Sequence, residues 1–212
     1  VDALVRTHPR MHDRSLAYTA TFWFLPSILV LATQVVLRDL GWMGLRLALV
    51  ALAGFLLTIV MGAQFLTIEP ESWRFRNARL VLNATAYVAA LFLFVTVYTS
   101  RLRSLLSATA ILLVSGMLAL ELFRIPPNKA WRTWLYAGLV ALTMGQLTWA
   151  LNYVRLDARV GGAFLLLVFY VLSGIIQQYL WRRLSRRMLL EYAFVGLMGM
   201  ALVSGLARWL LG

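Results

Sequence analysis

Long uninterrupted apolar runs alternate with short polar breaks along the whole chain. Each run is about 20 residues long, which is the length that an α-helix needs to cross the hydrocarbon of a bilayer. The runs are continuous and lack the polar–apolar alternation of a membrane β-barrel. The pattern therefore predicts an all-α, polytopic integral membrane bundle of seven transmembrane helices with short loops. We expect these helices at Leu16–Leu37, Leu47–Leu66, Leu80–Thr99, Leu105–Phe123, Thr133–Tyr153, Val160–Leu180 and Leu189–Leu210.

The composition agrees with lipid as the solvent of this chain. Hydrophobic residues make up 62% of the 212 residues and charged residues only 13%, whereas a soluble domain carries about 25% charged residues. So few charges cannot build a water-facing surface. We expect two parts, a basic cytoplasmic tail at residues 1–15 and a seven-helix transmembrane domain at residues 16–212.

Positive charge is unevenly divided between the two ends of the predicted helices. Thirteen lysines and arginines fall in the N-terminal tail and in the second, fourth and sixth breaks, and seven fall on the opposite side. Because lysine and arginine gather on cytoplasmic loops, we expect the N-terminus in the cytoplasm and the C-terminus outside.

The densest basic stretch is YLWRRLSRRMLLEY, residues 179–192. We interpret it as a cytoplasmic loop whose arginines contact anionic lipid head groups, an interaction worth about 1 kcal/mol per residue. Nucleic acid is not an expected partner, because the charges are spread over six loops and no recognition motif accompanies them. The arginines expected to contact lipid head groups are Arg124, Arg132, Arg182, Arg183, Arg186 and Arg187.

The chain is poor in the residues that hold metals and cofactors. It has no cysteine, and its two histidines, His8 and His12, fall in the N-terminal tail. The single lysine, Lys129, falls in a predicted loop and not in the last helix, where a retinal protein needs one. We therefore expect no metal and no cofactor in the spans. Ser173 and Ser204 each precede a glycine within a span, but no histidine is available there for an intramembrane serine protease.

Polar residues inside the spans are the remaining candidates for a site, because burying them in lipid is costly. Two carboxylates have arginine neighbours at helical spacing, Glu121 with Arg124 and Glu191 with Arg187, so each pair shares a helix face. One interpretation is a pair of interfacial ion pairs. The other is a polar pocket open to the cytoplasm for a head group, a small solute or a proton. The candidate pocket residues are Gln64, Asn83, Glu121, Gln177, Gln178 and Glu191.

The segment LSRRMLLEY, followed by a glycine-rich last span, resembles uncharacterised seven-helix membrane proteins of bacteria. The resemblance implies a location in the bacterial cytoplasmic (inner) membrane and no particular activity.

Three functions stay open on these observations. A non-catalytic scaffold or accessory subunit agrees with the short loops and with the small residues of the last helix, which favour close packing against the bundle, a partner protein or a second copy. A small-solute or lipid carrier would use the candidate pocket. An enzyme acting on lipid, the least favoured of the three, would need Glu121 or Glu191 as its acid or base.

Overall fold

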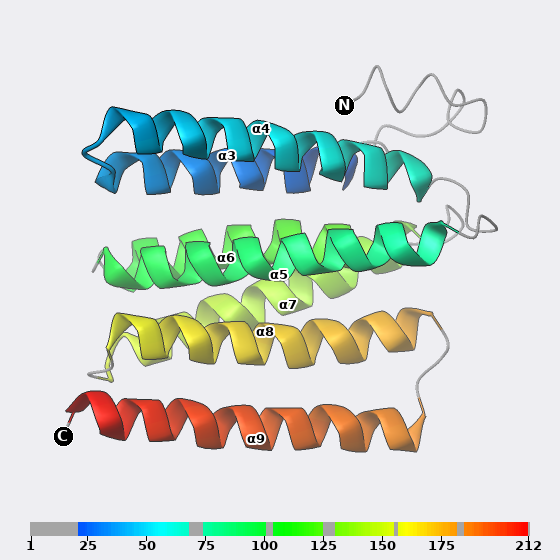
Figure 1. Cartoon of the computed structure of the whole chain (residues 1–212). Coiled ribbons are helices and arrows are strands. Elements are labelled where there is room, and N and C mark those ends of the chain that lie inside the picture. Colours follow the sequence, from blue (N-terminus) through cyan, green and yellow to red (C-terminus); the bar gives the residue numbers. More distant parts are fainter. Residues whose placement is uncertain are drawn as a thin grey trace. The chain divides into compact units, whose positions relative to one another are not determined.

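The computed structural model of the chain describes residues 21–67, 74–100, 104–124, 130–154, 157–181 and 185–211. Within these ranges it contains seven α-helices and no strand: α3 (Thr21–Asp39), α4 (Met43–Leu66), α5 (Phe75–Thr99), α6 (Ser104–Leu122), α7 (Ala130–Leu151), α8 (Ala158–Leu180) and α9 (Arg186–Leu211) (Figure 1). All seven are long and apolar enough to cross a membrane. The predicted all-α seven-helix class is therefore confirmed.

Several helices begin earlier than the apolar pattern predicts. Helix α4 begins at Met43 instead of Leu47, α5 at Phe75 instead of Leu80, and α9 at Arg186 instead of Leu189. The prediction followed the apolar runs, but arginine is a good helix former and its long side chain can reach from an apolar surface to water. The predicted start at Leu16 and the tail at residues 1–15 lie outside the described residues, so the domain boundary stays a prediction.

Local side-chain contacts fix three of the helix starts. The side chain of Asp157 accepts a hydrogen bond of 2.9 Å from the backbone N–H of Arg159 and caps α8. The hydroxyl of Ser185 accepts one of 3.3 Å from the N–H of Met188 at the start of α9. Before α4, the Nε of Arg46 donates to the carbonyl of Leu40 at 2.6 Å. These contacts supply some of the partners that helix ends lack.

The chain divides into two compact units, Val1–Ala89 and Ala90–Gly212. In the first unit, α3 and α4 form an antiparallel hairpin. Its turn is only three residues long, Leu40 to Trp42. Phe22, Leu25 and Ile28 of α3 are fully buried, so one face of this helix is a packing face.

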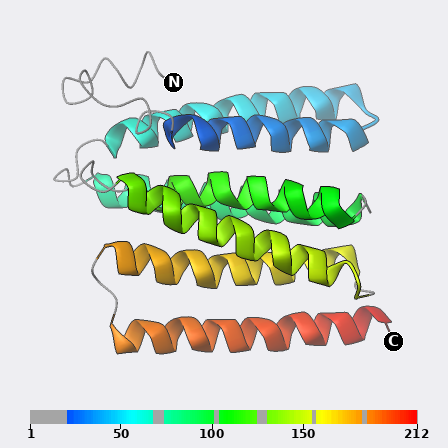
Figure 2. The same cartoon turned by 180° about the vertical axis from the view of Figure 1, so that it is seen from behind.

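The second unit contains the end of α5 and helices α6 to α9 (Figure 2). Small residues let α6 and α7 approach closely, because a Cβ on Gly116 would lie 3.1 Å from the Cβ of Ala141. Between α5 and α8, the rings of Phe94 and Phe169 meet edge to face with centroids 5.8 Å apart. Both rings are fully buried and form the centre of this unit.

Helix α9 packs on α8 along one face. A line of half-buried residues marks this face: Met188, Tyr192, Gly196, Gly199 and Val203. Tyr192 fits against Gly174 of α8, and Leu167 of α8 fits against Gly199. The other residues of α9 between Arg186 and Gly205 are exposed, and none in this range is buried.

Candidate functional site

The C-terminal end of α6 gathers polar side chains from three successive elements. Two prolines, Pro126 and Pro127, stand four residues after Leu122 and Phe123. Proline has no N–H, so it cannot give either carbonyl its usual helical hydrogen bond. The Nε2 of Gln177 on α8 donates to the Leu122 carbonyl at 3.2 Å. The hydroxyl of Thr133 on α7 donates to the Phe123 carbonyl at 3.3 Å.

A buried ion pair lies at the same helix end. The Nη2 of Arg124 is 3.3 Å from Oε1 of Glu121, and its Nη1 donates to Oε2 at 3.4 Å. Both residues are buried, with 1% of Glu121 and 6% of Arg124 exposed. A cation just after a helix C-terminus is favoured by the helix dipole. The pair as a whole carries no net charge, so the carboxylate can lie inside the bundle.

In the first unit, Gln64 has the same kind of contact with a proline-freed carbonyl. Pro26 lies inside α3 and cannot donate to the carbonyl of Phe22 four residues earlier. The Nε2 of Gln64 on α4 donates to this carbonyl at 3.1 Å. Gln64 is only 1% exposed. In lipid, a freed backbone group is tolerated where a neighbouring helix satisfies it, and Gln64 does so here.

The other three candidate pocket residues are Gln178, Glu191 and Asn83. Gln178 interacts through its side-chain amide with the hydroxyl of Tyr192 on α9. Glu191 pairs with Arg187 at 3.2 Å, and the two side chains are 62% and 91% exposed. Asn83 lies on α5 in the first unit, and its Oδ1 is buried without a hydrogen-bond partner. Within the second unit, the structure thus brings together Glu121 and Gln177.

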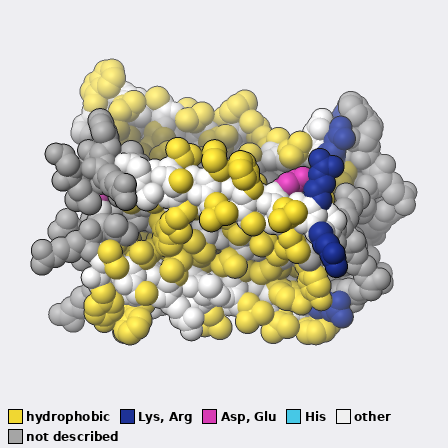
Figure 3. Space-filling view, turned by 90° about the horizontal axis from the view of Figure 1, so that it is seen from below, with side chains coloured by type: hydrophobic (Ala, Val, Ile, Leu, Met, Phe, Trp, Pro, Cys, Tyr) yellow, Lys and Arg dark blue, Asp and Glu magenta, His cyan; other side chains and the backbone are white. Residues whose placement is uncertain are grey.

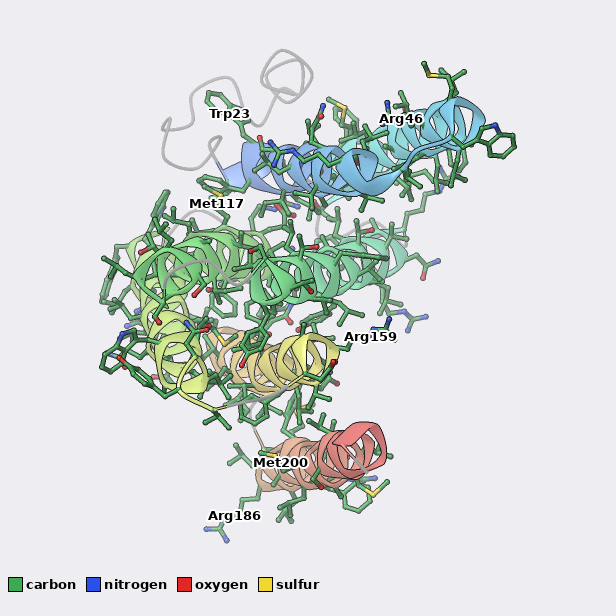
Figure 4. The ribbon with its side chains drawn as sticks, turned by 90° about the vertical axis from the view of Figure 1, so that its left-hand side faces the viewer. Trp23, Arg46, Met117, Arg159, Arg186 and Met200 are labelled. Atoms are coloured by element: carbon green, nitrogen blue, oxygen red, sulfur yellow. The ribbon has the colours of Figure 1, made fainter. Side chains whose placement is uncertain are left out.

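Arginines gather at one end of the face that α9 presents, whereas hydrophobic side chains cover its middle (Figure 3). Arg186 extends away from the other helices of its unit (Figure 4). Arg132 on α7 is half-buried, and its guanidinium carbon lies 5.6 Å from the ring centroid of Trp131. Arg182 and Arg183 lie outside the described residues. Contact of these arginines with lipid stays a prediction.

Several serine and threonine hydroxyls in the spans bond to the backbone of their own helices. Ser173, which precedes Gly174, is fully buried and donates to the carbonyl of Phe169. Thr148 and Ser115 donate in the same way to the carbonyls four residues earlier, at 2.8 and 2.6 Å. Such bonds satisfy the hydroxyl inside lipid and require no ligand.

Two buried polar residues, one in each unit, were not predicted from the sequence. Thr133 was placed at the start of a span without a role, although the prolines that free the Phe123 carbonyl were a usable signal. Arg79 was assigned to a loop, but it lies in α5 and is 7% exposed. Among the described residues, no group of three or more His, Cys, Asp or Glu side chains is placed to hold a metal ion. His8 and His12 lie outside the described residues.

Seven helices able to cross a membrane and a polar cluster at the end of one of them indicate an α-helical integral membrane protein. The family of proteins of unknown function DUF5656 matches residues 1–206, and the chain belongs to this family. No curated protein and no solved structure matches the chain significantly. The resemblance to an uncharacterised family is confirmed, and membership implies no particular activity.

Proposed function

We propose that this chain is a non-catalytic integral membrane protein that acts as a scaffold or accessory subunit through its last helix. The observation that carries this proposal is the exposure of α9, which packs one face on α8 and has no buried residue between Arg186 and Gly205. Leu190, Leu197 and Leu202 are exposed at 70% or more on its other faces. Exposed Ala193 and Ser204 lie among them, and small residues allow a second helix to approach closely.

The polar residues support a non-catalytic role. Gln64 and Gln177 donate to carbonyls that proline leaves without a helical partner. Both carboxylates of the candidate pocket lie in ion pairs, Glu121 with Arg124 and Glu191 with Arg187. An enzyme that acts on lipid has the least support, because both carboxylates that could serve as its acid or base are paired with arginine.

A carrier is the second candidate, and one observation favours it. Glu121 is 1% exposed at the end of a span, and a buried ionisable group inside a membrane protein often marks a solute or proton path. In this alternative, the Glu121–Arg124 pair would open to accept a polar solute.

The proposed location is the bacterial cytoplasmic membrane, with the N-terminus in the cytoplasm and the C-terminus outside. Its support is the excess of arginine and lysine on one side of the spans and the likeness of the last two helices to bacterial membrane proteins. Anionic lipids are the expected surroundings of that basic side.

Photo-crosslinking in living cells tests the scaffold function. A benzophenone side chain replaces Leu197 on the exposed face of α9, and a matched variant carries it at Leu139 on α7, which is 49% exposed. We expect a protein adduct of defined mass at position 197 and none at position 139. Lipid adducts alone at both positions, together with a stoichiometric solute in the purified protein, would favour the carrier instead.

A further inference from the structure

Two tyrosines and an arginine meet where α7 begins and α8 ends. The rings of Tyr136 on α7 and Tyr179 on α8 have centroids 5.7 Å apart at an interplanar angle of 68°. Their hydroxyl groups lie near enough to influence each other electrostatically. Arg132 stands one helical turn before Tyr136 and interacts with it electrostatically. Arginine and tyrosine hydroxyls thus share one end of the helix pair.

The chemistry of this group suits a phosphate. Each of the two tyrosine hydroxyls has a proton to donate. The guanidinium adds a planar fork of donors that matches phosphate oxygens. Charge-assisted hydrogen bonds of this kind are roughly twice as strong as neutral ones. An anion with several oxygen acceptors is therefore the ligand class that these side chains recognise.

Arg132 differs from the neighbouring arginines in what it contacts. Arg124 is buried against Glu121, and Arg187 pairs with Glu191. Within the part of the chain that the structure describes, Arg132 contacts the Trp131 ring and Tyr136 and has no carboxylate in an ion pair. Its charge is thus available to an anion, and hydroxyl donors stand beside it.

The surface next to this group identifies the anion as part of a lipid. Trp131 is 64% exposed at the start of α7, in a position where an aromatic ring anchors at the head-group level. Exposed Leu135, Leu139 and Leu142 follow it at helical spacing, on one face of α7. Acyl chains can lie along this apolar row while the phosphate stays beside Arg132. We propose that Arg132, Tyr136 and Tyr179 bind the phosphate of an anionic phospholipid, independently of any scaffold function.

Titration of the purified full-length chain with phosphatidylglycerol, followed by native mass spectrometry, tests the site. Arg132→Gln should weaken phosphatidylglycerol binding about tenfold, because a charge-assisted contact is lost. Tyr136→Phe and Tyr179→Phe remove only hydroxyls and should each weaken it by a smaller factor. Arg76→Gln on α5, an exposed position that is not among the arginines expected to contact lipid, removes the same charge from the same predicted membrane face. It is the matched control and should have little effect.

Three outcomes would overturn the site. Equal losses in Arg132→Gln and Arg76→Gln would mean that binding reflects only a diffuse attraction between charges. Unchanged binding in both phenylalanine variants would show that the two hydroxyls do not contribute to lipid binding. Full competition by millimolar inorganic phosphate would identify a soluble anion as the ligand instead of a lipid.

Discussion

At the scale of single residues, three prolines explain three polar side chains. Pro26, Pro126 and Pro127 cannot donate to the carbonyls of the residues four positions earlier. Gln64, Gln177 and Thr133, each from another helix, donate to these carbonyls. Pro26 interrupts α3, whereas the Leu122 and Phe123 carbonyls lie at the end of α6. In both places a carbonyl without a helical partner makes a specific contact with another helix.

The contact between Gln64 and the Phe22 carbonyl predicts a coupling between two substitutions. Gln64→Leu should lower stability in detergent by about 1–3 kcal/mol, because it leaves a buried carbonyl without its donor. Pro26→Ala returns an N–H to this carbonyl, so Gln64→Leu should cost much less in that background. Thermal unfolding of the four variants in a double-mutant cycle measures the coupling. Equal losses in both backgrounds would contradict it.

Contacts of the candidate site could be predicted where the two residues lie close together in the sequence. The pairs Glu121–Arg124 and Arg187–Glu191 followed from helical spacing, and the structure contains both. The partner of Gln64 lies 42 residues away and that of Gln177 55 residues away. Such contacts depend on how the helices are placed in space, which local spacing does not determine.

At the scale of elements, glycine sets how closely α8 approaches α5. A Cβ on Gly162 would lie 2.8 Å from the Cα and 2.9 Å from the backbone nitrogen of Val95. A backbone cannot move aside as a flexible side chain can. Gly161 next to it meets the ring of Tyr98, whose hydroxyl donates to the carbonyl of Leu151 at 3.1 Å.

Gly162→Ala should therefore destabilise the protein, by about 1–3 kcal/mol, as overpacking of a tight contact does. Gly138→Ala on α7 is the matched control, because a Cβ there meets nothing within 4 Å. It should be neutral or slightly stabilising, since alanine is the better helix former. Thermal unfolding in the same detergent measures the stability of both variants. An equal change in stability for the two would contradict the close approach of α8 to α5.

The spans themselves were predictable, but their contacts were not. Length and hydropathy identify a helix that crosses a membrane. They do not mark the face that packs, because lipid tails are as apolar as the side chains of a neighbouring helix. Leu197 and Leu165 are equally apolar in the sequence, yet one is 73% exposed on α9 and the other is fully buried on α8.

At the scale of the whole molecule, the distribution of charge predicts orientation. Thirteen of the twenty lysines and arginines belong to the tail and to the even-numbered breaks. Translocation of such loops is disfavoured, so they should lie in the cytoplasm. The lipid site at Arg132 would then face the cytoplasmic leaflet, where anionic lipids give a negative surface potential.

Cysteine labelling tests this orientation directly, because the chain has no cysteine of its own. Ser185→Cys places a thiol before α9, and Val154→Cys places one after α7 at a position that is 52% exposed. A membrane-impermeant maleimide added to intact spheroplasts should label position 154 and spare position 185. Inside-out vesicles should give the opposite result. If spheroplasts label position 185 instead, the N-terminus lies outside, and the charge excess does not set the orientation of this protein.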